Sequence, residues 1–287
     1  MFTVIQISDT HLSPDRSQFV PNWRAVGDWV RTQRPALVIN TGDVSLDGAD
    51  NVGELRFCNE EFAALGTPVL CVPGNHDVGD APHITPGQPV NDERQARWRG
   101  VFGHDWWFRD IENWRLVGIN NMLFGTGYPD EAIQLAWLER LLQDASDRRL
   151  ALFMHRPAFV CQPDEPEDRK WSLHPEPRAH FLKLVSRHRM SLVAAGHLHR
   201  ARLFHHAGTQ YVWCPSAAFV CGPLIQRDLP GEQIIGAVIH TFGGESVRSE
   251  FVQPPGTTRL VIDDFVDDVY PGTLARLALR RARGQHQ

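Results

Sequence analysis

Short apolar runs recur along the first two thirds of the chain, and each is three to five residues long. Several of them carry β-branched residues, which is typical of strands that are buried on both faces. We expect five such strands, at residues 4–7, 37–39, 69–72, 150–154 and 192–195.

Between these runs, apolar residues recur with helical spacing, as Trp23, Val26 and Val30 do. Because strands and helices alternate, the pattern favours a layered α/β architecture. The predicted helices cover residues 22–33, 53–65, 130–143 and 177–187.

The pattern of predicted elements changes after Gly196, from alternating strands and helices to hairpins. Two hairpins are indicated, one turning at residues 207–209 and the other at 242–245. We therefore expect the second half of the fold to be antiparallel. Pro254-Pro255-Gly256 marks a break, so we expect a main domain over 1–252 and a C-terminal tail over 253–287, which could form a helix.

Two segments match none of the expected core elements. Residues 79–99 hold three prolines and mixed charge, and residues 156–177 are rich in proline and acidic residues. Long loops in a compact domain are usually functional or disordered.

Composition narrows the class of protein. The 287 residues are 42% hydrophobic and 22% charged, ordinary values for a soluble globular protein. The formal net charge is −5, so we do not expect duplex nucleic acid as a partner, because neutralising its phosphates requires clustered Lys and Arg. Only residues 276–283 are locally basic, and we interpret them as a solvated tail or a terminal helix.

Five cysteines without a C-x-x-C pair indicate buried free thiols in a reducing compartment. A strand-like run starts at Phe2, and no apolar run approaches about 18 residues, so neither a signal peptide nor a transmembrane helix is expected. We expect a cytoplasmic protein with no membrane partner.

Each of the five predicted strands is followed by residues with polar chemistry. Because ligands in α/β sheets collect outside the carboxyl ends of strands, these residues are expected to converge. The stretches are Ser8-Asp9-Thr10-His11, Asn40-Thr41-Gly42-Asp43, Pro73-Gly74-Asn75-His76-Asp77, Met154-His155-Arg156-Pro157 and Ala195-Gly196-His197-Leu198-His199.

The types of these side chains indicate a metal site. Mixed nitrogen and oxygen donors suit divalent Zn, Mn or Fe, and the absence of cysteine from the set argues against a structural zinc site. Seven candidate donors are too many for one ion with an open position, so two divalent ions are expected. The donors are Asp9, His11, Asp43, Asn75, His155, His197 and His199.

Taken together and in order, these motifs resemble those of the calcineurin-like metallophosphoesterases, over roughly residues 3–216. The quoted motifs are Asp9-x-His11, Gly42-Asp43, Gly74-Asn75-His76-Asp77, His155-x-Pro157 and Gly196-His197-x-His199. The resemblance implies a four-layer α/β/β/α sandwich of two mixed sheets and a phosphoric ester hydrolase with a metal-bridging hydroxide as nucleophile.

The resemblance also implies a role for each residue. Asp9, His11 and His199 would hold the first ion. Asn75, His155 and His197 would hold the second, with Asp43 bridging the two. His76 would face the substrate, either to stabilise developing charge or to protonate the leaving oxygen. Asp77 would orient His76 or a nearby backbone group, or act as a plain turn carboxylate.

Among these enzymes the chain looks most like the bacterial cyclic-nucleotide and glycerophosphodiester branch, which favours small phosphodiesters as substrates. In that branch a second histidine often follows the ligand at the end of the fourth predicted strand. In this chain the ligand is His155, and Arg156 follows it. Arg156 either grips a second anionic group of the substrate or pairs with an acid in its own loop. The alternative functions are a phosphomonoesterase for small metabolites and a non-catalytic binding module.

Two further features leave alternatives open. Tryptophans near the predicted rim could stack on a nucleobase, although packing is the more frequent role of such side chains. The tail could cap the site or mediate formation of a homo-oligomer. The tryptophans are Trp98, Trp106, Trp107 and Trp171.

Overall fold

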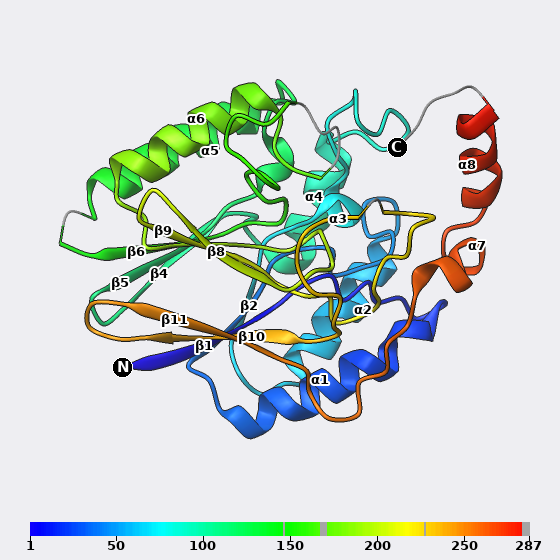
Figure 1. Ribbon diagram of the computed structural model, residues 1–287, viewed down its shortest axis with the longest axis horizontal. Helices are drawn as coiled ribbons and strands as arrows, with labels where there is room; N and C mark the ends of the chain where they lie inside the picture. The colour runs from blue at the N-terminus through cyan, green and yellow to red at the C-terminus, as the bar shows by residue number, and fades with distance from the viewer. Residues whose placement is uncertain (146, 167–170, 227, 283–287) are drawn as a thin grey trace.

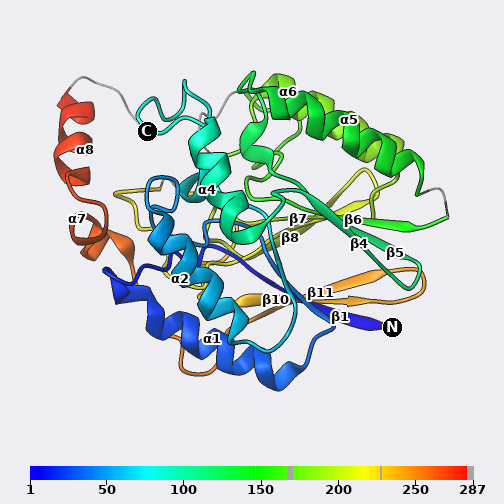
Figure 2. The same ribbon diagram turned by 180° about the vertical axis from the view of Figure 1, so that it is seen from behind.

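The computed structural model describes residues 1–145, 147–166, 171–226 and 228–282. Two mixed β-sheets lie face to face, and helices cover the outer face of each sheet (Figure 1). Seen from behind, α1 and α2 lie on one outer face and α5 and α6 on the other (Figure 2). The architecture is the four-layer α/β/β/α sandwich that the sequence predicts.

The first sheet has five strands in the order β11-β10-β1-β2-β3. The strands β1, β2 and β3 are parallel, and β10 joins β1 antiparallel with Thr3 opposite Thr241. Their bounds are β1 Phe2–Ile7, β2 Leu37–Asn40, β3 Val69–Cys71, β10 Ala237–Phe242 and β11 Val247–Val252.

The second sheet has six strands in the order β4-β5-β6-β7-β9-β8. The strands β5, β6, β7 and β9 are parallel to one another, whereas β4 and β8 are antiparallel edge strands. Their bounds are β4 Trp107–Ile111, β5 Trp114–Gly118, β6 Arg149–Phe153, β7 Leu192–Ala195, β8 Arg202–His206 and β9 Thr209–Trp213.

The expectation of an antiparallel second half is wrong for β9, which pairs with β7 in parallel. All five residues of β9 are buried, so it takes the inner position, while the partly exposed β8 folds back along the edge. The β4–β5 hairpin was not predicted, because Arg109, Asp110 and Arg115 interrupt its apolar pattern. In the structure Arg115 pairs with Asp110 at 2.8 Å.

Apolar side chains fill the space between the two sheets and the spaces under the helices. Trp114 and Phe153 from one sheet meet Ile39 and Phe242 from the other in the central layer. The covering helices are α1 Val20–Gln33, α2 Val52–Ala63, α5 Pro129–Gln143 and α6 Pro175–Arg187, close to their predicted bounds. Short helices at connections are η1 Ser17–Phe19, α3 Asn75–Val78 and η2 Asn121–Leu123.

The expectation that residues 79–99 match no core element is wrong for their second half. Helix α4 spans Asp92–Phe102, and the side chain of Asn91 caps it by accepting from the Arg94 N–H at 2.9 Å. Trp98 is fully buried and stacks on Phe102. Because this helix is mostly polar, its one buried face does not produce a recognisable helical spacing of apolar residues in the sequence.

The segment at 156–177 also contributes to the core, because Phe159, Trp171 and Leu173 are buried beneath α6 and its neighbours. Glu165 organises the loop by accepting hydrogen bonds from the N–H groups of Val160 and Cys161, each at 2.7 Å. The described part of this proline-rich segment is therefore packed against the second sheet.

Residues 253–282, which we call the C-terminal segment, carry three short helices. Their bounds are η3 Ile262–Asp264, α7 Val266–Val269 and α8 Thr273–Ala282. Ile262, Val266 and Val269 are buried against Phe19 and Phe219. The helices α7 and α8 lie at the edge of the molecule in Figure 1. The domain boundary at residue 253 stays a prediction.

Four of the five cysteines are buried, whereas Cys161 is exposed, so the expectation of buried thiols is wrong for Cys161. Among the described helices, none has the length and apolar character that crossing a bilayer requires.

Candidate metal centre

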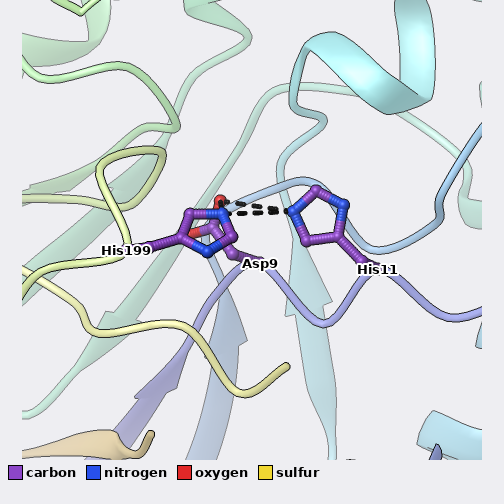
Figure 3. A group of neighbouring side chains, drawn as sticks. All are labelled: Asp9, His11 and His199. Atoms are coloured by element: carbon purple, nitrogen blue, oxygen red, sulfur yellow. Dashed lines mark hydrogen bonds and ion pairs between the residues drawn. The ribbon is translucent and has the colours of Figure 1, made fainter. Parts of the chain in front are cut away.

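Three of the predicted donors form a compact group at the carboxyl ends of β1 and β7. The Nε2 atoms of His11 and His199 lie 3.2 Å apart, and the Oδ1 atom of Asp9 lies 3.4 Å from His199 Nε2 and 4.0 Å from His11 Nε2. Figure 3 shows both imidazole rings directed at the Asp9 carboxylate.

A second group lies at the ends of β2, β3, β6 and β7. His155 Nε2 is 3.1 Å from His197 Nδ1, 3.3 Å from Asn75 Oδ1 and 3.3 Å from Asp43 Oδ2. The same Oδ2 atom of Asp43 is 3.8 Å from His11 Nε2 in the first group. Asp43 therefore joins the two groups through one carboxylate.

Hydrogen bonds on the outer side of two imidazole rings show which ring nitrogens face inward as acceptors. The Nδ1 atoms of His155 and His199 each lie 2.8 Å from a backbone carbonyl, of Thr41 and Phe219 respectively. A carbonyl only accepts, so each Nδ1 carries a hydrogen, and in the neutral ring each Nε2 directs a lone pair into the site. This is the arrangement that metal-ligating histidines adopt.

The residues therefore fit divalent cations. Bonds of about 2.0–2.2 Å to one ion place neighbouring donors roughly 3.0–3.5 Å apart, and the closest contacts within the two groups have this spacing. The mixture of imidazole, carboxylate and amide donors suits Mn, Fe or Zn.

The electrostatics of the site also favour positive charge. Burial disfavours the imidazolium of His155, but the Asp43 carboxylate outweighs burial and raises the His155 pKa to about 9. Burial likewise opposes ionisation of Asp43, yet His155 and His76 hold its pKa well below the usual range. Burial, assisted by His76, lowers the pKa of His11. The Asp43 carboxylate thus remains ionised and attracts cations.

The backbone is strained at five of the seven predicted donors. Asp9, His11, Asp43, His197 and His199 have φ values between 42° and 70°, in the left-handed region that non-glycine residues rarely adopt. Such strain persists only where surrounding contacts enforce it.

Hydrogen bonds from backbone N–H groups and from one hydroxyl group hold the backbone in this conformation. The N–H of Asp9 donates to the Gly42 carbonyl at 2.9 Å, and the N–H of His11 donates to the Asp43 carbonyl at 3.0 Å. The hydroxyl of Ser216 donates to the Asp9 carbonyl at 2.8 Å. The loops after β1 and β2 are thereby joined to the loop after β9.

Asp77 holds the Asp43 loop in place. The hydrogen bonds described for its carboxylate go to other residues than His76. One oxygen accepts from the N–H groups of Val44 at 3.1 Å and Gly74 at 2.9 Å, and the other accepts from the N–H and hydroxyl of Ser45. Asp77 is fully buried and lies outside the pocket lining. Of the predicted roles, its geometry matches the orientation of neighbouring backbone groups.

Gly74 is required by a close contact rather than by a turn. Its φ is −106°, which any residue adopts, but an added Cβ would lie 2.2 Å from Asp43 Oδ1. The glycine is required because the Asp43 carboxylate approaches this backbone closely.

Arg156 does not line the pocket, and it pairs with an acid, although not with an acid of its own loop as predicted. Its guanidinium is buried and forms two hydrogen bonds with Asp80, which belongs to the 79–99 segment rather than to the loop of Arg156. A guanidinium matches a carboxylate through two parallel bonds, so a buried acid within reach binds it in preference to solvent.

His76 and the two donor groups open into a cavity of about 290 Å³. The hydrogen on His76 Nδ1 is donated to the Leu46 carbonyl at 2.9 Å, so Nε2 is the ring nitrogen available to a ligand. Trp171 also lines the cavity, whereas Trp98, Trp106 and Trp107 do not. The rest of the lining is formed by Phe219, Cys221, Ile225, Ile262, Val266, Tyr270, Thr273, Arg276 and Leu277.

Two residues of this site were missed by the sequence analysis. The side-chain oxygen of Asn121 accepts from the N–H groups of His155 and Arg156, each at 3.2 Å, and so fixes the β6 strand end. Asn121 follows β5, and the rule that polar residues follow buried strands would have found it had β5 been recognised. The hydroxyl of Tyr270 lies 3.1 Å from His11 Nδ1, and no motif in the sequence signals this contact.

Comparison with known proteins agrees with this geometry. The family described as calcineurin-like phosphoesterase matches residues 2–201 of the chain. The chain therefore belongs to this family, and it is a metal-dependent phosphoric ester hydrolase, as the sequence motifs predicted.

Bacterial phosphodiesterases are among the similar sequences. A probable cyclic nucleotide phosphodiesterase from Synechococcus is 26% identical over 75% of this chain and 80% of its own length. The 3′,5′-cyclic adenosine monophosphate phosphodiesterase CpdA of Escherichia coli is 27% identical, but the match spans only 53% of this chain and 54% of CpdA. A probable glycerophosphodiester phosphodiesterase GpdQ from Arcobacter nitrofigilis is 25% identical over 69% of this chain and 71% of the relative.

Solved structures support the fold. A purple acid phosphatase from yellow lupin superposes with a TM-score of 0.66 and 14% identity over 90% of this chain and 52% of that protein. A dimetal phosphatase from Danio rerio superposes with a TM-score of 0.58 and 16% identity over 87% of this chain and 95% of that protein.

Proposed function

We propose that this protein hydrolyses small phosphodiesters, of cyclic-nucleotide or glycerophosphodiester type, at a centre of two divalent metal ions. The observation that carries the proposal is the junction of the two donor groups at the single carboxylate of Asp43. Bacterial relatives named as cyclic nucleotide and glycerophosphodiester phosphodiesterases support the choice of substrate class.

On this proposal each ion has its own ligands. Asp9, His11 and His199 hold the first ion. Asn75, His155 and His197 hold the second, and Asp43 bridges the two. Mn, Fe and Zn all suit these donors, because none of them is a cysteine and the set mixes nitrogen with oxygen.

Two such ions, when bound, polarise the phosphoryl oxygens and lower the pKa of water so that hydroxide is available for in-line attack at neutral pH. The residues of the chain hold the acid in position and supply the proton for the leaving group. The Asp43 carboxylate accepts the His76 N–H at 2.9 Å, which fixes His76 beside the donor groups. His76 uses Nε2 to protonate the ester oxygen that leaves.

The size of the cavity agrees with a small substrate. About 290 Å³ is at the lower end of the range for small-molecule sites, and the lining residues other than the donors are largely apolar. A phosphodiester places its phosphoryl group beside the donor groups and one ester substituent against these apolar residues.

The alternative of a phosphomonoesterase was motivated by Arg156, which could have bound a dianionic group. Its pairing with Asp80 outside the cavity withdraws that support. The alternative of a non-catalytic module requires loss of donors, and all seven predicted donors are present and close together.

Paired kinetics on manganese-loaded protein test the proposal. Hydrolysis of bis(p-nitrophenyl) phosphate is compared with that of p-nitrophenyl phosphate, and Asp43→Ala and Asn75→Ala serve as blanks whose folding is checked by circular dichroism. We expect faster diester hydrolysis, and we expect both variants to lose it while remaining folded.

The possible results separate the candidate functions. A diester preference that both variants abolish justifies assays with 3′,5′-cyclic nucleotides and glycerophosphodiesters. A monoester preference contradicts the proposed substrate class. Full activity in either variant contradicts the assigned metal ligands.

A further inference from the structure

The C-terminal segment is attached to the body of the protein next to the metal centre. The N–H of Val220 donates to the Leu260 carbonyl at 2.9 Å, and the N–H of Ile262 donates back to the Val220 carbonyl at 3.0 Å. Asp263 accepts from the N–H groups of Gly222 at 3.0 Å and Leu224 at 2.7 Å. These bonds join the segment to the loop that follows β9.

Tyr270 is the point at which this segment meets the donor groups. Its hydroxyl oxygen lies 3.1 Å from Nδ1 of His11, and its ring centroid lies 5.3 Å from that of His76. Its backbone is held on both sides, because its N–H donates to the Val266 carbonyl at 2.7 Å and its carbonyl accepts the Thr273 hydroxyl at 2.7 Å.

His11 differs from His76, His155 and His199 in the group that binds its outer ring nitrogen. For His76, His155 and His199 the partner is a backbone carbonyl, which is fixed by the fold. For His11 the partner is the Tyr270 side chain, 259 residues further along the chain. The orientation and tautomer of His11 therefore depend on one hydroxyl group from outside the matched family region of residues 2–201.

We propose that Tyr270 is a positioning residue of the metal centre: its hydroxyl accepts the hydrogen on His11 Nδ1 and so directs the Nε2 lone pair at the first ion. The C-terminal segment is then part of the active site. This inference rests on the proposed metal centre, and its test uses metal binding as well as turnover.

The test compares full-length Tyr270→Phe with the wild type. Phenylalanine keeps the ring against His76 and removes only the hydroxyl. Loss of such a partner weakens metal affinity by roughly tenfold to a hundredfold, so we expect one of two Mn²⁺ sites to weaken by this factor in calorimetry and the electron paramagnetic resonance spectrum of the bound ion to change. We expect kcat to fall more than KM rises.

Tyr128→Phe is the matched control, because it also loses a hydroxyl hydrogen bond, to Asp92, away from the cavity. It is expected to bind Mn²⁺ like the wild type. The melting temperature of the metal-free protein separates positioning from stability. We expect Tyr270→Phe to melt within about 1 °C of the wild type, because a loss of 1 kcal/mol lowers the melting temperature of a domain of 150–250 residues by about 2–4 °C.

Unchanged Mn²⁺ affinity at both sites in Tyr270→Phe would overturn the inference, as would a wild-type protein that binds no Mn²⁺. Failure of the proposed function has a different signature. In that case the wild type binds two ions and does not hydrolyse phosphodiesters, while the affinity difference between Tyr270→Phe and Tyr128→Phe still measures the positioning role.

Discussion

The guanidinium of Arg156 and the carboxylate of Asp80 form a buried, two-pronged ion pair, with Nη1 3.1 Å from Oδ1 and Nη2 2.5 Å from Oδ2. The pair joins the end of β6 to the loop that follows α3, and so fixes the strand end that carries His155 relative to helix α3, which carries Asn75. Arg156 therefore lies beside the metal centre but does not line the cavity.

Breaking this pair is expected to destabilise the protein without changing substrate binding. Arg156→Met leaves a buried carboxylate uncompensated, and Asp80→Asn leaves a buried guanidinium, so each should cost about 3–5 kcal/mol in the free energy of unfolding. The double variant removes both charges and should recover much of that loss. Urea denaturation of the four proteins measures this cycle.

Kinetics on the same variants test the position of Arg156. We expect the KM of folded Arg156→Met for a phosphodiester to stay within about twofold of the wild type, because a side chain outside the cavity contributes no substrate binding. A tenfold or greater rise in KM with unchanged stability would show that Arg156 binds substrate in the working enzyme.

A second prediction concerns Gly196, which precedes the two histidines of the last motif. An added Cβ would lie 1.9 Å from Ser8 Oγ and 2.7 Å from Asp9 Oδ2, so Gly196→Ala must displace the Asp9 carboxylate. A misplacement of about 1 Å costs on the order of a hundredfold in rate, and we expect this loss in kcat/KM together with weaker Mn²⁺ binding.

Gly100→Ala is the control for this substitution. Gly100 lies in α4, and an added Cβ has no neighbour within 4 Å. Alanine in a helix interior is favoured over glycine by about 0.5–1 kcal/mol, so Gly100→Ala should be active and slightly stabilised. Wild-type kinetics and metal binding in Gly196→Ala would contradict the close approach of Asp9 to this backbone.

The role of Asp77 gives a third prediction. Asp77→Ala leaves the buried N–H groups of Val44, Ser45 and Gly74 without their carboxylate, so unfolding should become easier by about 3 kcal/mol and kcat should fall as the Asp43 loop moves. Asp28→Ala, which removes an exposed carboxylate paired with Arg31, should cost less than about 1 kcal/mol. A stable but inactive Asp77→Ala protein would indicate instead that the carboxylate takes part directly in the reaction.

The sequence was sufficient to predict β1, β2, β3, β6 and β7 and to place the candidate donors after these strands. A strand buried on both faces is a local run of apolar residues, and the polar residues that follow it are adjacent in the chain, so both can be read without knowledge of the tertiary structure. The donors then had only to meet at one edge of the sheets, which parallel strands ensure.

Two contacts beside the metal centre that the sequence did not predict are long-range. Asp80 and Arg156 are 76 residues apart, and Tyr270 and His11 are 259 residues apart, so no spacing rule connects them. The insertion of β9 beside β7 depends on which strand buries both faces, and the hairpin at residues 202–213 gave no direct sign of it. Helix α4 was hidden because its only fully buried aromatic residue is Trp98.

The last prediction concerns His240, which is fully buried in β10, away from the metal centre, between Gln6 and Ser249. Burial lowers its pKa from 6.5 to about 3, so it stays neutral in the folded protein and becomes charged only on unfolding. A depressed histidine pKa contributes stability that is present above pH 6.5 and is lost as the pH falls toward 3.

Replacing His240 with glutamine removes this proton uptake and keeps a polar side chain between Gln6 and Ser249. Relative to pH 7, the wild type should lose about 2 kcal/mol more than His240→Gln by pH 5, measured by urea denaturation. The histidines of the metal centre are present in both proteins, so their contribution cancels in the difference. His205→Gln, at an exposed position in β8, should follow the wild-type curve. Parallel curves for the wild type and His240→Gln would show that His240 takes up a proton in the folded protein, against the burial argument.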